Sequence, residues 1–143
     1  MFALPDIIVL TGNLDYTITL DPSAWLFDDR KFDLDQYFEE PHDLDNPPRK
    51  YKKRELLKED YTFGVPLKPF LENASPKPEA EKLIIETKDG KQHEISIEKA
   101  KSAVLGFSKD GKFLNEDGPA HFYHGDGSNR ENPVTDITKF IVR

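Results

Sequence analysis

The stretch of sequence that decides the fold is LIIETKDGKQHEISI, residues 83–97. Apolar and polar residues partly alternate on both sides of Asp89-Gly90. An Asp-Gly pair between two such runs is the strongest short-range signal for two antiparallel strands joined by a tight turn. The sequence therefore predicts a β-hairpin here, at the centre of a longer ordered pattern that runs from Gly64 to Pro119.

The segment before this hairpin predicts more strands. Residues 7–10 form a short apolar run and residues 16–20 alternate, with Gly12-Asn13 as the turn between them. Residues 31–38 fit two patterns: Phe32 and Leu34 alternate as in a strand, whereas Leu34, Tyr37 and Phe38 suit one face of a helix. A brief helical turn is expected at 67–71.

The segment after the hairpin predicts a helix and then strands. Ser96 can cap a short helix that reaches Leu105. Asp110-Gly111 marks a second hairpin, between residues 105–107 and 113–114. Strands follow at 120–124 and 137–142, separated by a polar loop. The expected fold class is a β-rich mixed α+β domain.

Length and composition limit the class of protein. A chain of 143 residues with 36% hydrophobic residues fits one domain, 1–143. No run approaches the ~18 apolar residues of a membrane span, and the first ten residues lack the pattern of a signal peptide. We therefore expect a cytoplasmic protein without a membrane partner. Cysteine is absent, which excludes disulfides and thiolate metal sites.

Charge is distributed unevenly along this acidic chain of net charge −7. Residues 1–46 hold 11 acidic and 2 basic side chains, an arrangement that argues against a nucleic-acid surface there. Residues 41–60 form a proline-rich and partly basic insertion, for which we expect loop at 41–50 and a short helix at 52–60. We interpret the basic run 49–54 as a solvated segment.

Several short motifs occur in an order typical of one known family. They are Val9-Leu10-Thr11-Gly12-Asn13 with Thr19-Leu20, Gly64-Val65-Pro66-Leu67 with Phe70-Leu71, Asp89-Gly90, and the segment from Leu105 to Asp117-Gly118-Pro119. In this order the chain resembles a small member of the sulfite-oxidase-type molybdopterin-binding family. The resemblance implies a scaffold of that type.

The resemblance also implies which chemistry is missing. Enzymes of that family hold molybdenum through one cysteine thiolate, and this chain has no cysteine. The segment where that ligand is expected, between Trp25 and Gly64, is rich in Asp and Pro instead. We therefore expect a family scaffold without the metal and without a cofactor, although a residual molybdopterin-related oxidoreductase stays an alternative.

The candidate ligand-binding residues lie in the loop 125–133. Asp126, Ser128, Asn129 and Arg130 are polar side chains on a glycine-bearing loop, a setting that often binds ligands when a sheet supports it. Arg130 stands out because a guanidinium can hold a carboxylate or phosphate with two parallel hydrogen bonds. The alternative is a long turn whose polar side chains bond their own backbone.

His121 and His124, with Asp126 two residues further on, are the nearest approach to a metal-ligand cluster in the sequence. Imidazole can bind a divalent metal such as zinc, but residues three apart on a strand point to opposite faces. Packing along the strand is the alternative.

The function expected from these features is a binding or interaction module, with a small molecule or a protein as its partner. An enzyme of undetermined type is the alternative, for instance a peptidyl-prolyl isomerase or a hydrolase. An isomerase needs an apolar proline pocket, for which Phe107, Phe113, Phe122 and Tyr123 are candidates.

Overall fold

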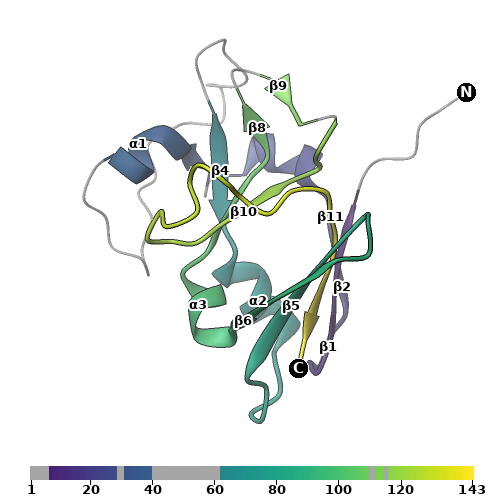
Figure 1. The fold of residues 1–143 in the computed structure, drawn as a ribbon. Coiled ribbons are helices and arrows are strands. Elements are labelled where there is room, and N and C mark those ends of the chain that lie inside the picture. Colours follow the sequence, from purple (N-terminus) through teal and green to yellow (C-terminus); the bar gives the residue numbers. More distant parts are fainter. Residues whose placement is uncertain (1–6, 29–30, 40–61, 110–111, 115) are drawn as a thin grey trace, which may run out of the picture.

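Two β-sheets organise the chain in a computed structural model that describes residues 7–28, 31–39, 62–109, 112–114 and 116–143. The first sheet has five strands in the order β2-β1-β11-β5-β6 (Figure 1). Its central strand β11 pairs in parallel with β1 and antiparallel with β5. The five strands are β1 (Ile8–Gly12), β2 (Ile18–Leu20), β5 (Lys82–Thr87), β6 (Gln92–Ser96) and β11 (Ile137–Val142).

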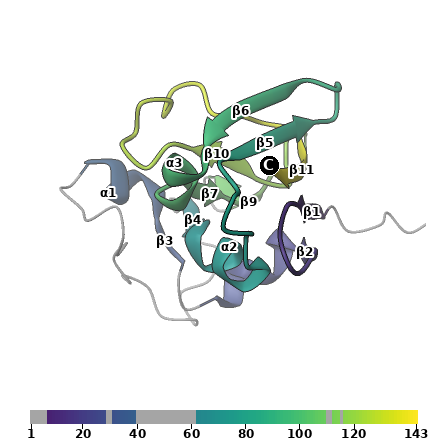
Figure 2. The ribbon, with the colours of Figure 1, turned by 90° about the horizontal axis from the view of Figure 1, so that it is seen from below.

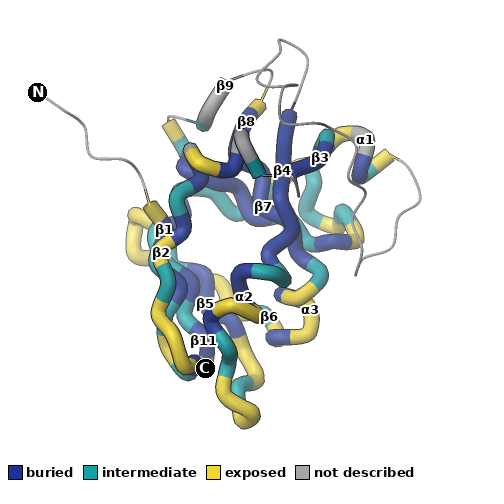
Figure 3. Tube along the Cα trace, turned by 180° about the vertical axis from the view of Figure 1, so that it is seen from behind, coloured by how far each residue is buried: buried dark blue, intermediate teal, exposed yellow. Residues whose placement is uncertain are grey.

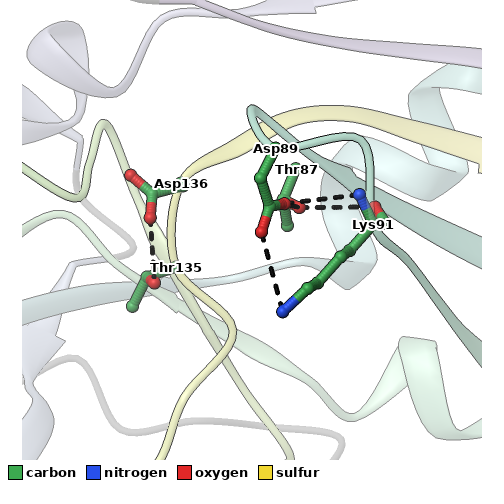
Figure 4. A network of polar contacts seen from close by, with 5 residues as sticks. All are labelled: Thr87, Asp89, Lys91, Thr135 and Asp136. Atoms are coloured by element: carbon green, nitrogen blue, oxygen red, sulfur yellow. Dashed lines mark hydrogen bonds and ion pairs between the residues drawn. The ribbon is translucent and has the colours of Figure 1, made fainter.

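The predicted hairpin is confirmed as β5 and β6, whose register pairs Glu86 with Gln92. Its turn is fixed by Asp89, which contacts the Thr87 hydroxyl and accepts a 3.3 Å hydrogen bond from the Lys91 amide (Figure 4). The Thr87 hydroxyl, followed by the Lys91 amide, lowers the pKa of the Asp89 carboxyl. The turn also contacts the segment before β11, because the Lys88 amide donates to the Asp136 carbonyl at 2.8 Å.

The second sheet has four strands in the order β10-β7-β4-β3. Beside it lies a two-stranded ribbon of β8 and β9, which pairs Ser108 with Phe113. This ribbon is the expected second hairpin, but its first strand lies at 108–109 and its turn residues 110–111 fall outside the described part. The strands are β3 (Phe32–Asp33), β4 (Phe63–Pro66), β7 (Val104–Gly106), β8 (Ser108–Lys109), β9 (Lys112–Phe113) and β10 (His121–Tyr123).

Short helices connect these strands, and α2 and α3 lie beside each other below β4 (Figure 1, Figure 2). Ser96 caps α3 as predicted, since its hydroxyl accepts the Lys99 amide at 3.2 Å. The helix is shorter than expected because Val104 and Leu105 join β7, where pairing with two neighbouring strands overrides helix propensity. The helices are η1 (Pro22–Phe27), α1 (Leu34–Glu39), α2 (Lys68–Ala74) and α3 (Ile97–Lys101).

The segment 31–38, which fitted two patterns, contains both structures: strand β3 and then helix α1. The chain changes from strand to helix at Leu34 because a helix places Leu34 and Tyr37 on one face, where both side chains are almost fully buried. The whole of the expected 41–60 insertion, including its short helix, lies outside the described residues.

Apolar side chains gather in two clusters. The large cluster takes side chains from both sheets and from α2 and α3, and Figure 3 shows β4 and β7 buried along their length. The small cluster consists of Phe32, Leu34, Tyr37 and Val104, with Phe38 and Tyr123 packed against it. In the described part of the chain no helix is long and apolar enough to cross a membrane. The fold is thus mixed α+β and rich in strands, as predicted.

Candidate functional site

A polar cavity of about 460 Å³ lies next to the small apolar cluster. We call it the α1 cavity, because Asp35, Phe38 and Glu39 of α1 form one wall. Its other walls come from β7, β8, β10 and the loop that follows β10. The charged residues that line it are Asp35, Glu39 and Glu131, which are acidic, and Lys109 and Arg130, which are basic.

Helical spacing explains how α1 supplies this wall. Residues three and four apart lie on the same face of a helix, so Asp35, Phe38 and Glu39 share one side. Leu34 also borders the cavity, and together with Tyr37 it anchors α1 in the small cluster. The sequence of α1 is therefore amphipathic on the scale of two turns, and its polar side faces the cavity.

The loop 125–130 docks against α1 through several contacts (Figure 1). The Tyr37 hydroxyl donates to the Gly125 carbonyl at 3.4 Å. Gly127 has a φ of +77°, and a β-carbon there would lie 3.3 Å from Cδ1 of Phe38. Glycine at this position therefore permits both the backbone conformation and the close approach of the loop to α1.

Arg130 connects the loop to both carboxylates of α1. Its Nη2 donates to Oδ1 of Asp35 and to Oε1 of Glu39, each at 3.2 Å. The guanidinium carbon lies 5.4 Å from the centre of the Phe38 ring, within the range of a cation–π contact. Burial lowers the pKa of Arg130, but the hydrogen bonds to Glu39 and Asp35 outweigh it and leave the pKa raised. Nε and Nη1 have no partner among the described residues.

Two further polar groups line the cavity from β10. His121 is 8% exposed, and its Nε2 lies 2.9 Å from Oδ1 of Asp117. Although these two atoms lie within ion-pair distance, Nε2 has no hydrogen-bond partner within the described segments. Burial, followed by the charges of Asp35 and Asp117, raises the pKa of the Tyr123 phenol. Tyr123 therefore stays protonated at neutral pH and can donate a hydrogen bond.

Of the four predicted ligand-binding residues, only Arg130 lines the α1 cavity. Asn129 holds the loop together, because its amide oxygen accepts the His124 amide at 2.8 Å and its amide nitrogen donates to the Phe122 carbonyl at 3.1 Å. Asp126 accepts the Ser128 amide at 2.9 Å, and this bond comes first among those that lower the pKa of the Asp126 carboxyl.

A separate, smaller cavity of about 230 Å³ is lined by Asp126, Ser128 and His124. His121 and His124 thus border different cavities, in line with the expectation that they point apart. The described residues contain no group of three or more His, Cys, Asp or Glu side chains placed to hold a metal ion.

Two of the aromatic side chains considered for a proline pocket lie in the core. Phe107 and Phe122 are fully buried in the large cluster, where Phe107 packs edge-on against Trp25 at 5.9 Å. Tyr123 lines the α1 cavity, and the Phe113 side chain lies outside the described atoms.

The largest of the cavities described here, about 650 Å³, lies between α2 and α3. Two of the lysines at its rim already pair with carboxylates: Lys77 with Asp15, and Lys101 with Glu98 at 3.3 Å.

Comparison with known proteins adds information on the fold. No protein-family model and no curated protein matches the sequence. The fold is similar to that of the sulfane dehydrogenase SoxCD from Paracoccus pantotrophus, with a TM-score of 0.59 and 14% identity. The match covers 96% of this chain and 38% of that chain. At this identity the similarity establishes a distant relation in fold, consistent with the sulfite-oxidase-like scaffold expected from the sequence.

Proposed function

We propose that the protein is a binding module that holds a small molecule through an anionic group in the α1 cavity. The proposal depends on one observation: the Arg130 guanidinium is held in place, and two of its nitrogens lack partners in the described part of the chain. Asp35, Glu39 and Phe38 fix its guanidinium at the cavity wall, while Nε and Nη1 lack partners among the described residues. Nε and Nη1 lie on different edges of the guanidinium, so each can donate a separate hydrogen bond to an anionic oxygen of a carboxylate or phosphate. Little side-chain freedom is lost, because the guanidinium is already held in place.

Other donors at the same cavity support an anionic group. Lys109 lines the cavity and forms no ion pair with any described residue. The Tyr123 hydroxyl likewise has no hydrogen-bond partner within the described segments. A volume of about 460 Å³ lies in the range typical of small-molecule sites.

We also propose that the chain is a small, cysteine-free relative of the sulfite-oxidase-type proteins, and that it does not carry out their redox reaction. The support is the set of donor atoms. No thiolate is available anywhere in the sequence, and the polar side chains that line the α1 cavity are carboxylates, cations, hydroxyls and the His121 imidazole. Such a lining does not fit a metal held by sulfur.

Ligand-induced thermal stabilisation tests the proposal. Butyrate, succinate and inorganic phosphate are added to the full chain, each against sodium chloride of equal ionic strength. We expect at least one anion to raise the melting temperature, and Arg130→Gln to remove this increase. Lys82→Gln is the matched control, because Lys82 is an exposed, ion-paired cation on β5, away from the cavity. Equal stabilisation of the Arg130 variant, or no stabilisation by any anion, would refute the proposal.

A further inference from the structure

The charges of the α1 cavity do not match those of a simple anion. Three carboxylates line it, those of Asp35, Glu39 and Glu131, against the two cations Lys109 and Arg130. A purely anionic ligand would gain the two cations but would lie close to three groups of its own sign. We infer that the ligand is zwitterionic: it carries an ammonium or guanidinium group as well as the anionic group. This inference rests on the proposed function and specifies the ligand of the same site.

Several carboxylate oxygens on the acidic side of the cavity have no hydrogen-bond donor among the described residues. Arg130 engages Oδ1 of Asp35 and Oε1 of Glu39, so the second oxygen of each carboxylate has no partner among the described residues. Glu131 forms no ion pair with any described side chain. These oxygens accept hydrogen bonds, and an ammonium group offers three donors to them.

Aromatic rings border the same part of the cavity. Phe38 and Tyr123 both line it, with ring centres 5.3 Å apart and planes inclined by 55°. Phe38 already stacks on one cation, that of Arg130. Arg130 is therefore an example, within the chain itself, of a cation that two carboxylates of α1 hold beside an aromatic ring.

The basic side of the cavity supplies the donors that would bind the anionic group of the ligand. Nε and Nη1 of Arg130, the Lys109 ammonium and the Tyr123 hydroxyl are all donors, and each can donate a separate hydrogen bond to an anionic oxygen. A molecule that carries both charges therefore uses both sets of groups, while a molecule with a single charge leaves one set unmatched. The polar lining also favours a ligand that is polar along most of its length.

Matched probes of equal length separate these cases. Calorimetric titration of the full chain compares 4-aminobutyrate with butyrate and with n-butylamine. Glycine and 6-aminohexanoate are added to sample other distances between the two charges. We expect one of the amino acids to bind about tenfold more tightly than either the anion or the amine, because its second charge finds a partner.

Two substitutions assign the charges to residues. Glu131→Gln should weaken the best amino acid several-fold and slightly strengthen butyrate, since it removes a negative charge from the cavity. Arg130→Gln should weaken both. Glu81→Gln is the matched control, because Glu81 is an exposed glutamate that does not line the cavity. Circular dichroism checks that each variant is folded.

The outcomes distinguish this inference from the proposed function. Butyrate that binds as tightly as every amino acid, and depends on Arg130, would overturn the zwitterionic ligand and leave anion binding intact. Binding of the amine alone, without any requirement for Arg130, would overturn both. The absence of binding by all five probes at tens of millimolar would also count against both.

Discussion

A substitution of Asn129 is the sharpest test of what stabilises the loop 125–133. Asn129→Ala removes two hydrogen bonds: the 2.8 Å bond from the His124 amide and the 3.1 Å bond to the Phe122 carbonyl. The Phe122 carbonyl keeps a second donor, the Val134 amide at 3.2 Å, whereas the His124 amide loses its acceptor. With ~1 kcal/mol for each bond and a further cost for the unpaired donor, we expect a loss of about 2–3 kcal/mol in the free energy of unfolding.

Urea denaturation followed by the fluorescence of Trp25 measures this loss. For a slope of 1–3 kcal/mol/M, about 2 kcal/mol lowers the urea midpoint by about 1 M. Asn132→Ala is the matched control, because Asn132 is an exposed asparagine of the same loop whose side chain forms no hydrogen bond with described residues. It should change stability by less than about 0.5 kcal/mol. Equal effects of the two substitutions would refute a structural role for Asn129.

Three further predictions concern the cavity, the helix cap and the hairpin turn. In Gly106→Ala the new β-carbon would lie 3.0 Å from Cε2 of Tyr123, so the tyrosine ring must shift. Calorimetric titration should then show weaker anion binding. Thermal melts should show a loss of about 1–3 kcal/mol in the free energy of unfolding. Ser96→Ala should lower stability by about 1 kcal/mol in urea, with most of it restored by Ser96→Asp, because only the latter keeps a side-chain acceptor at the N-cap. The Thr87 hydroxyl lowers the pKa of the Asp89 carboxyl in the folded state. Ionised Asp89 therefore stabilises the fold at pH values above its pKa in the unfolded chain. This stabilisation is lost as the pH falls through the lower pKa of the folded state. The urea midpoints of the wild type and Asp89→Ala should therefore differ near pH 6 and converge near about pH 2; a gap that does not depend on pH would contradict this.

The sequence predicts those elements whose causes are local. The Asp89-Gly90 turn and the alternation around it are enough to place β5 and β6, and Ser96 is enough to start α3. The end of α3 was not predictable in the same way, because Val104 and Leu105 leave the helix to pair with β4 and β10. Such partners are distant in sequence and leave no local pattern.

The same distinction applies to the candidate site. Arg130 was selected from its residue type and its place in a polar loop, and it does line the α1 cavity. Its partners Asp35 and Glu39 lie more than 90 residues away in sequence, within a segment that fitted both strand and helix. The spacing of Asp35, Phe38 and Glu39 carries the signal only once that segment is known to be helical.

Asp126 and Asn129 show why polar loop residues are ambiguous in a sequence. A carboxylate or an amide that binds a ligand and one that bonds its own loop have the same residue type and often the same neighbours. The difference lies in whether a backbone amide takes up the acceptor, and here the amides of Ser128 and His124 do so.

The position of β11 has a consequence for biosynthesis. This strand joins β1 to β5, so the pairs β2-β1 and β5-β6 have no ladder between them until residues 137–142 are in place. Among the residues described, these leave the ribosome last. The nascent chain therefore carries two half-sheets with open edges, and strands in that state readily associate with other chains. Closing the sheet requires contacts such as Val9 with Lys139, and pairing between residues so distant in sequence tends to slow folding.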